Sequence, residues 1–219
     1  MKKNFVTELH KKTKRNYKKR MINNKVECMR IAKKYSKDYW DGNRKFGYGG
    51  YRYIDGYWKK TALKIIKNYG LKENSKVLDI GCGKGFLIFE IKRLIPSINI
   101  FGIDYSKYAI LNAKKEIKKN LRVFDARKKL PFKKKSFDLV ISLGTLHNFS
   151  LKQLSSSIKE INRVGKKSYI MVESYRNDQE LFNLQCWALT CKTFLHEKDW
   201  IWFLKENNFK GDYEFIFFE

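Results

Sequence analysis

The chain has 219 residues, of which 43% are hydrophobic and 16% aromatic. This composition excludes a disordered chain, and the length suits one domain with a full core better than two. The formal net charge of +26 is compatible with nucleic acid, an anionic membrane surface or an acidic substrate as partner. It is equally compatible with a lysine-rich proteome, because net charge governs solubility and association rather than fold.

The start of the chain and its cysteines predict a cytoplasmic location. The segment MKKNF is followed by more charge and lacks the apolar region of a secretory signal, and no apolar run is long enough to span a membrane. No two cysteines form a C-x-x-C pair, so the spacing predicts reduced thiols and neither a metal site nor a disulfide framework. The four cysteines are Cys28, Cys82, Cys186 and Cys191.

Residues 1–58 are predicted to form a basic N-terminal arm followed by an aromatic segment. Nine of the first twenty residues are Lys or Arg, so we expect a frayed or helical arm. Residues 39–58, YWDGNRKFGYGGYRYIDGYW, contain eight aromatic residues and five glycines, which is typical of a packed loop. We expect Tyr48 and Tyr51 to form a lid that covers substrate; the alternative is a patch of core under an N-terminal helix.

Residues 59–219 alternate between strand and helix patterns and are predicted to form the main domain. Such alternation builds right-handed βαβ units, so we predict an α/β fold with a doubly wound, mostly parallel sheet and helices on both faces. The expected helices are 59–69, 84–95, 106–119, 151–161, 186–195 and 197–207; the segment 186–195 is expected to cover the substrate site. The expected strands are 76–80, 98–104, 121–125, 136–144, 168–174 and 213–219.

The segment VLDIGCGKGF, residues 77–86, predicts a ligand site after the first strand. Ligands of open parallel sheets bind beyond the carboxyl ends of the strands, and glycines there let a ligand approach the backbone. Neither the dinucleotide pattern G-x-G-x-x-G nor the phosphate-loop pattern fits, because Phe86 stands where the third glycine would be and no Lys-Ser or Lys-Thr follows. An acid two residues before the first glycine, Asp79, favours a ligand with a positively charged group.

These residues, together with FGIDYS at the end of the second strand, resemble the class I (Rossmann-like) methyltransferases that use S-adenosylmethionine, over about residues 60–175. The resemblance implies a loop that wraps the methionine part of the cofactor, with Asp79 near its amino group and Asp104 on the ribose hydroxyls. The sequence departs from this family at its end, where one closing strand is found in place of a hairpin; either the sheet is shortened or FLHEK forms irregular structure. The cofactor-binding residues implied are Asp79, Gly81, Cys82, Gly83, Gly85, Asp104, Tyr105, Asp125, Ala126 and Leu143, with Tyr105 over the adenine, Asp125 on its amino group and the Ala126 N–H on the ring.

The rim beyond the fourth and fifth strands is where catalysis is expected. In LGTLHNF, His147 is a candidate base, with an ordinary pKa of about 6.5; the alternative is a histidine that hydrogen-bonds to the backbone. In VESYRN, Glu173 is the second catalytic candidate, and Tyr175 and Arg176 are substrate candidates, with helix caps as the alternative.

The predicted function is methyl transfer to a small molecule. The rim lacks the N/D-P-P-Y/F tetrapeptide, a cysteine and the Lys-Asp-Lys-Glu set of nucleic-acid methyltransferases. The alternatives are an RNA methyltransferase that uses the basic arm, a non-catalytic cofactor-binding module, and transfer of a group other than methyl. The sequence leaves monomer and homodimer equally open.

Overall fold

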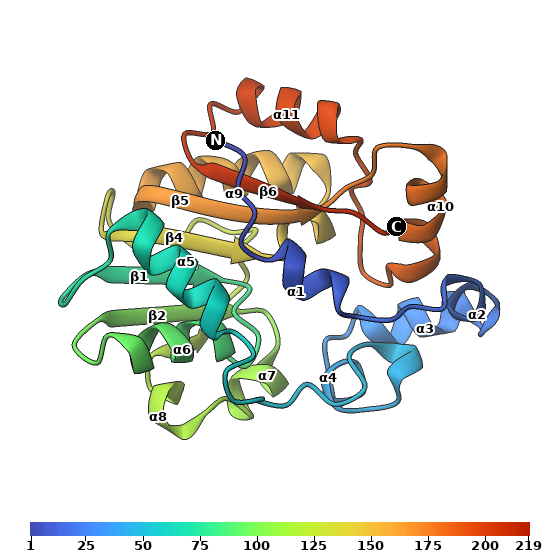
Figure 1. Ribbon diagram of the computed structural model, residues 1–219, viewed down its shortest axis with the longest axis horizontal. Coiled ribbons are helices and arrows are strands. Elements are labelled where there is room, and N and C mark those ends of the chain that lie inside the picture. Colours follow the sequence, from blue (N-terminus) through green and yellow to red (C-terminus); the bar gives the residue numbers. More distant parts are fainter.

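The computed structural model describes residues 1–219 as a six-stranded sheet in the order β3-β2-β1-β4-β5-β6, with every neighbouring pair parallel. The predicted α/β fold is therefore confirmed, and strand order reverses between β1 and β4 (Figure 1). The strands are β1 (Lys76–Ile80), β2 (Asn99–Asp104), β3 (Leu121–Val123), β4 (Phe137–Leu143), β5 (Gly165–Glu173) and β6 (Asp212–Ile216).

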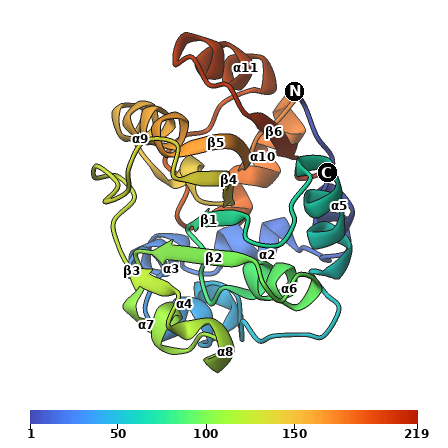
Figure 2. The ribbon, with the colours of Figure 1, turned by 90° about the vertical axis from the view of Figure 1, so that its left-hand side faces the viewer.

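Helices cover both faces of this sheet (Figure 2). On one face, α5 (Lys59–Tyr69) and α6 (Phe86–Leu94) pack on an apolar cluster that includes Ile65, Ile88 and Ile100. On the other, α9 (Leu151–Val164) and α11 (Glu197–Glu206) pack on a cluster that includes Leu78, Ile158 and Trp200. The remaining helices are α1 (Thr7–Lys11), α2 (Tyr17–Ile22), α3 (Lys25–Ala32), α4 (Lys37–Trp40), η1 (Arg44–Phe46), α7 (Lys107–Leu111), α8 (Lys115–Lys118), η2 (Leu146–Asn148) and α10 (Asp178–Trp187).

Two helix predictions are wrong. The segment 106–119 forms two short helices, α7 and α8, because the chain leaves helical geometry after Asn112. The segment 186–195 contributes only the end of α10, and Ala188 is already extended. The backbone N–H groups of Lys192 and Thr193 donate instead to the His147 carbonyl oxygen, at 3.0 Å each, and these bonds replace those of a helix.

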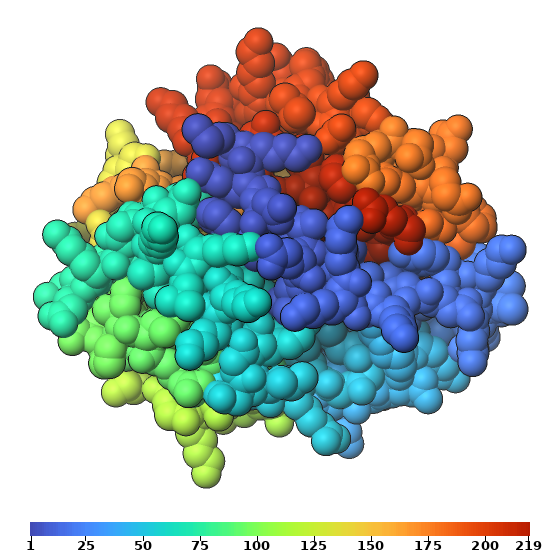
Figure 3. Space-filling view, viewed as in Figure 1, coloured from blue at the N-terminus to red at the C-terminus, as the bar shows by residue number.

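The N-terminal arm is docked rather than frayed, and it covers the edge strand β6. The Lys3 N–H donates to the Tyr213 carbonyl oxygen (2.8 Å), and the Tyr213 N–H donates to that of Met1 (3.1 Å). An exposed strand edge is open to pairing with other chains, and this pairing closes it. Figure 3 shows the arm, in blue, lying between α5 and the C-terminal elements. The closing hairpin is absent, as expected, because β6 is parallel to β5.

The buried Glu214 carboxylate holds the arm in place. It accepts hydrogen bonds from the backbone N–H groups of Phe5 and Thr7, at 2.7 Å each, from that of Val6, and from the Tyr169 hydroxyl. A buried charge needs such partners to be tolerated. Residues 1–7 are thus part of the folded domain, and Val6 lines the larger cavity described below. None of the helices combines the length and apolar character required to cross a membrane.

Candidate functional site

The site lies at the carboxyl ends of β1, β2 and β4, around the loop Gly81–Gly85. Ile80 and Ile103 are register partners, so the chain leaves β1 and β2 side by side, and the Gly81 N–H donates to the Ile103 carbonyl oxygen (2.8 Å). Gly81 has a φ of +77° and Gly83 of +56°, a backbone region that favours glycine.

The glycines are required by neighbouring protein groups, which corrects the expectation that all three face a ligand. A Cβ on Gly81 would overlap the Thr145 side chain, and one on Gly83 would lie 2.9 Å from the Trp40 ring. Gly81 and Gly83 line a cavity, but Gly85 does not: its Cβ would lie 2.7 Å from the Ile117 side chain. Gly85 therefore serves packing at the start of α6.

Asp104 connects the second strand to the glycine loop. Its side chain accepts from the Gly83 N–H (2.8 Å) at one oxygen and from the Ser106 N–H (2.7 Å) at the other. Burial raises the pKa of this carboxyl, and the two N–H groups oppose the shift. Each carboxylate oxygen can accept a further bond, so Asp104 can receive two hydroxyls from the cavity it lines.

Asp79 lies in the same region without any hydrogen-bond partner in the protein, although only 5% of its surface is exposed. Burial, and then the charge of Asp104, raise its pKa to about 7. Its side chain lines the larger of two cavities. A buried carboxylate in this state is stabilised by any cation that enters the cavity.

The smaller cavity, of about 210 Å³, lies beyond β2 and β4. Its lining includes Asp104, Tyr105, Asp125, Ala126 and Leu143. The Asp125 carboxylate is already engaged by the Arg127 guanidinium (2.7 and 2.8 Å), which holds its pKa below the ordinary value. Arg127 also lies over the Tyr105 ring, 5.2 Å from its centroid.

Two polar atoms of residues that line this cavity have no hydrogen-bond partner in the protein. The Asn148 Oδ1 is buried and accepts no hydrogen bond, and the Ala126 N–H has no acceptor in the protein. A buried polar atom without a partner is costly. One acceptor and one donor, next to Asp104, match the hydrogen-bonding edge and sugar of a nucleoside.

The aromatic segment 39–58 packs directly on the glycine loop. The Trp40 Nε1–H donates to the Ser106 hydroxyl (2.8 Å), and the Lys84 ammonium pairs with the Asp41 carboxylate (2.7 Å). Tyr48 is stacked on Trp40, with ring centroids 5.2 Å apart, and lines both cavities. These contacts place the segment over the glycine loop; they fit both the expected lid and the alternative of a packed patch of core.

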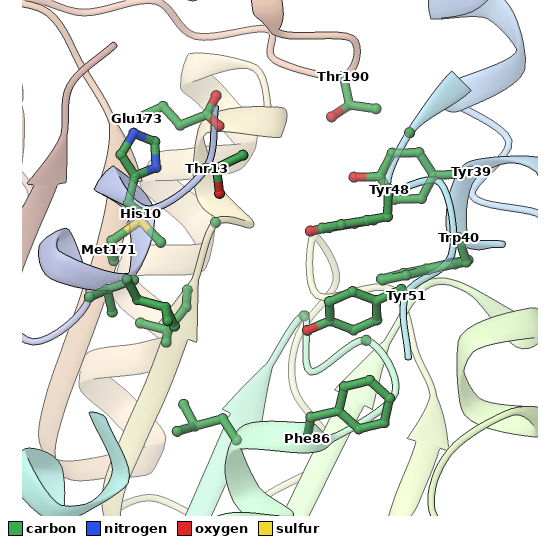
Figure 4. Close-up of a pocket in the computed structure, with 18 of the residues that line it drawn as sticks. His10, Thr13, Tyr39, Trp40, Tyr48, Tyr51, Phe86, Met171, Glu173 and Thr190 are labelled. Atoms are coloured by element: carbon green, nitrogen blue, oxygen red, sulfur yellow. The ribbon is translucent and has the colours of Figure 1, made fainter. Parts of the chain in front are cut away.

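The larger cavity, of about 420 Å³, extends from Gly81 to the N-terminal arm. Figure 4 shows two facing walls: His10, Thr13, Met171 and Glu173 on one side, and the rings of Tyr39, Trp40, Tyr48 and Tyr51 on the other. The two cavities share Gly81, Leu143 and Gly144. Because they meet there, one extended ligand can occupy the smaller cavity and reach into the larger.

His147 and Glu173 come together on the wall of the larger cavity, with the His147 Nε2 3.4 Å from the Glu173 carboxylate. The Glu173 N–H donates to the His147 Nδ1 (3.3 Å), so the hydrogen of the ring sits on Nε2 and faces the carboxylate. Burial lowers the pKa of His147, and the charge of Glu173 only partly offsets this. His147 therefore has no free lone pair, and its geometry is that of a residue that positions Glu173.

Three predicted residues have other surroundings. Tyr175 and Arg176 line neither cavity. The Arg176 guanidinium pairs with Glu180 and with Glu219 (2.8 Å), and thus ties α10 to the last residue. Cys82 lines the larger cavity, but its sulfur packs against Gly102 beneath the loop. The assignment of Tyr175 and Arg176 as substrate contacts therefore stays a prediction that neither cavity supports.

Sequence reasoning missed several cavity residues. Thr190 lines both cavities, and Asn148 lines the smaller one. Asn148 stands beside His147 in LGTLHNF, so the motif itself was a signal. His10 and Thr13 had no signal, because a basic arm carries no pattern that predicts where it docks.

An open parallel sheet with an acid in its first strand, an acid ending its second, and adjoining cavities at the intervening loop is the architecture of class I methyltransferases that use S-adenosylmethionine. The chain belongs to this family. Residues 71–215 match the methyltransferase domain family, and residues 2–130 also match protein-L-isoaspartate(D-aspartate) O-methyltransferase. The family's cofactor is S-adenosylmethionine, in agreement with the expectation from the glycine loop.

Three curated relatives are similar to the chain. They are an uncharacterized protein of Methanocaldococcus jannaschii (35% identical over 57% of this chain and 46% of that one), demethylmenaquinone methyltransferase of Thermotoga maritima (27%, 78% and 72%), and ubiquinone biosynthesis O-methyltransferase of Pelagibacter ubique (32%, 68% and 63%). The chain thus spans about half the length of the first relative and somewhat more of the other two.

Solved structures share the fold. A chain of a complex that contains the Haloferax volcanii Trm112 methyltransferase activator matches with a TM-score of 0.54 at 21% identity, over 70% of this chain and 72% of that one. The YcgJ protein of Bacillus subtilis matches with a TM-score of 0.53 at 21% identity, over 67% and 66%. At this identity the likeness concerns the fold alone.

Proposed function

We propose that the protein transfers a methyl group from S-adenosylmethionine to a small-molecule acceptor. The observation that carries this proposal is the larger cavity, which adjoins the nucleoside-sized cavity at Gly81 and is walled by aromatic rings and the docked N-terminal arm. Such a concave site, with aromatic walls and a few charged groups, suits a small ligand. Two of the relatives, named for demethylmenaquinone and for ubiquinone biosynthesis, are consistent with it.

The residues that would bind the cofactor are assigned from the polar groups that line the two cavities. Asp104 accepts the two ribose hydroxyls, while the Ala126 N–H and the Asn148 Oδ1 bind the adenine. Tyr105 and Asp125 flank the adenine, and Asp79 is the counter-charge for the amino group of the methionine part. A carboxylate near pKa 7 favours its charged form once a cation lies beside it.

The chain itself positions the acceptor and handles its proton. When bound, S-adenosylmethionine supplies an activated methyl group together with its own leaving group. The aromatic segment excludes water and aligns the acceptor, which is where most of the rate in such a displacement is gained. A Glu173 carboxylate oxygen accepts the proton that the acceptor's O–H or N–H loses, and the His147 Nε2–H fixes the orientation of that carboxylate.

The test is calorimetric titration with S-adenosylmethionine, followed by transfer of labelled methyl into a small-metabolite extract. We expect a one-to-one complex and labelled products below 1 kDa. Glu173→Gln should reduce transfer about 100-fold while cofactor affinity stays the same. The matched control is Glu206→Gln, at the exposed end of α11. Binding without any transfer would point to a non-catalytic module and overturn the proposal.

RNA is the second candidate acceptor, because the chain has a net charge of +26 and many lysines in its N-terminal arm. RNA binding through such a surface weakens steeply with salt. Labelled methyl recovered in extracted RNA, with transfer that falls steeply between 50 and 200 mM salt, would replace the small-molecule proposal. A product whose added mass differs from that of a methyl group would instead indicate that a different group is transferred.

A further inference from the structure

The larger cavity contains three arginines gathered on one tryptophan. Arg15, Arg20 and Arg44, here called the arginine cluster, all line the cavity together with Trp187. Their guanidinium carbons lie 5.4, 4.6 and 5.1 Å from the centroid of the Trp187 ring. Helix α2 packs against α10 here, so the cluster joins the N-terminal arm to the end of α10.

None of these three arginines has a carboxylate partner. Arg15 donates to the carbonyl oxygens of His10 and Thr13 and to the His10 Nδ1, Arg20 to those of Trp187 and Arg44, and Arg44 to that of Gly47. Five other arginines each pair with an acid: Arg30, Arg93, Arg127, Arg163 and Arg176. Of the remaining two arginines, Arg122 donates to backbone carbonyl oxygens, as the cluster does, but it lines neither cavity. The cluster is therefore distinguished by three arginines without an acid gathered in one cavity.

Donors remain open at the cluster. The Nη2 groups of Arg20 and Arg44 make no hydrogen bond and are not among the fully buried atoms. A guanidinium that stacks on a ring keeps its N–H edge available, and that edge matches two oxygens of a carboxylate or phosphate. The open edges thus have the geometry that recognises an oxyanion.

Burial and the neighbouring positive charges together disfavour the charged forms of the groups in this cluster. Burial, and then the charge of Arg44, lower the pKa of Arg20 to about 10. Lys25, which donates to the carbonyl oxygens of Cys186 and Ala188, has its pKa lowered to about 8 by burial and then by Arg20. An anion placed among these groups would stabilise all of them.

We propose that the arginine cluster is an anion-binding subsite that holds a carboxylate or phosphate group of the small-molecule acceptor. The inference deepens the proposed function and rests on it, since it assigns a substrate class to the same cavity. Aromatic walls at Tyr39, Tyr57 and Trp187 accommodate an apolar or aromatic body. The acceptor class is therefore an organic acid or phosphate ester with a flat or apolar part.

The test compares three probes in calorimetric titrations of the full chain saturated with S-adenosylhomocysteine. Phenylacetate and phenyl phosphate are anionic, and phenylacetamide is the neutral counterpart of phenylacetate. We expect at least one anion to bind about tenfold or more tightly than the amide, because charge-assisted bonds of this kind are among the stronger ones. The tighter of the two anions identifies the acceptor group as carboxylate or phosphate.

Variants test whether the preference for anions depends on the arginine cluster. The double variant Arg20→Gln and Arg44→Gln should reduce the anion's affinity about tenfold or more and leave that of the amide unchanged. Arg122→Gln is the matched control, since Arg122 also donates to backbone carbonyls but lines neither cavity. Should the double variant not fold, the wild-type protein still decides: the anion's affinity should fall with added salt, and the amide's should not.

Three results would overturn the subsite: no preference for anions in the wild-type protein, a preference that survives the double variant, or tight binding of a 12-residue oligouridylate that depends on Arg20 and Arg44 and replaces small-anion binding. Failure of the proposed function would be seen separately, as absent binding of S-adenosylhomocysteine. A protein that binds this nucleoside and methylates neutral metabolites would refute the subsite alone.

Discussion

The two cavities differ in how their charged groups are prepared for a ligand. In the smaller cavity, Asp104 already accepts two backbone N–H groups, and Asp125 is paired with Arg127. In the larger one, Asp79 has no partner, and the arginine cluster has no acid. The carboxylates of the first cavity are thus already held by hydrogen bonds and an ion pair, and only neutral groups there, the Asn148 Oδ1 and the Ala126 N–H, have no partner. The second cavity has charged groups of both signs without an opposite charge as partner.

This difference indicates which kind of ligand group each cavity is suited to bind. A buried carboxylate that is already held by N–H groups can take neutral hydroxyls without further rearrangement. A buried charge without a partner is costly until an opposite charge arrives, so its persistence in a fold points to a charged ligand. We therefore expect the smaller cavity to discriminate by shape and hydrogen bonding and the larger one by charge.

The largest expected effect concerns the loop that separates the cavities. Gly81→Ala should lower the free energy of unfolding by about 3–5 kcal/mol, because its φ of +77° is strained for alanine and the new Cβ overlaps Thr145. Urea denaturation measures the change. Gly70→Ala is the control: its φ is +63° but nothing lies within 4 Å of the new Cβ, so the loss should be about 1 kcal/mol.

A second change separates the clash from the strain. Adding Thr145→Gly to Gly81→Ala should recover part of the lost stability, because it removes the side chain that the Cβ meets. If the double variant is no more stable than Gly81→Ala alone, the protein neighbour is not the reason for this glycine.

The next largest effect tests the hydrogen bonds of Asp104 in the smaller cavity. Asp104→Asn should weaken S-adenosylhomocysteine binding by about 100-fold or more, since an amide cannot accept both N–H groups and two hydroxyls. Calorimetric titration measures the affinity. Asp138→Asn, whose side chain pairs with Lys166 away from both cavities, should leave it unchanged. Equal losses in the two variants would contradict the assignment.

Substitution of Asp79 should have two opposite effects, a gain in stability and a loss of cofactor affinity. Because its pKa is about 7 in the folded protein and 3.8 ordinarily, the charged form destabilises the fold increasingly from about pH 4 to pH 7 and constantly above. At pH 8, Asp79→Asn should raise the free energy of unfolding by up to about 4 kcal/mol and weaken S-adenosylhomocysteine binding about tenfold. Thermal unfolding and titration at pH 4 and pH 8 measure both.

The gain in stability should vanish at pH 4, where the carboxyl is protonated in the folded and the unfolded chain alike. In the wild-type protein, affinity for the nucleoside should fall as the pH drops through about 7. A variant that is less stable than wild type at pH 8 would show that Asp79 has a partner after all.

The smallest expected effect concerns the segment over the loop. Trp40→Phe removes the hydrogen bond to Ser106 and should cost about 1 kcal/mol of unfolding free energy. Release of S-adenosylhomocysteine, followed by stopped-flow fluorescence, should become a few times faster because the covering segment is less firmly held. Trp202→Phe, at a ring that is 62% exposed, should change neither quantity.

The strands and the four helices α5, α6, α9 and α11 that pack on the sheet could be predicted because their apolar spacing is local. The segment 186–195 could not, since its apolar residues fit a helix while its N–H groups bond to His147, far away in sequence. His147 itself is a similar case: the sequence allows a base or a histidine that hydrogen-bonds to the backbone, and only the contact between its Nδ1 and the Glu173 backbone shows that its lone pair is occupied.

The class of the sheet and the position of the loop after its first strand could be read from the chain alone, because they follow from hydrophobic period and glycine spacing. The resemblance to class I methyltransferases implied the roles of Asp79 and Asp104. The strand order, the docking of the N-terminal arm and the arginines that it brings to Trp187 come from the folded structure. A basic, weakly patterned segment has no local preference for one surface. Its place depends on long-range partners such as the buried Glu214 carboxylate, more than 200 residues away.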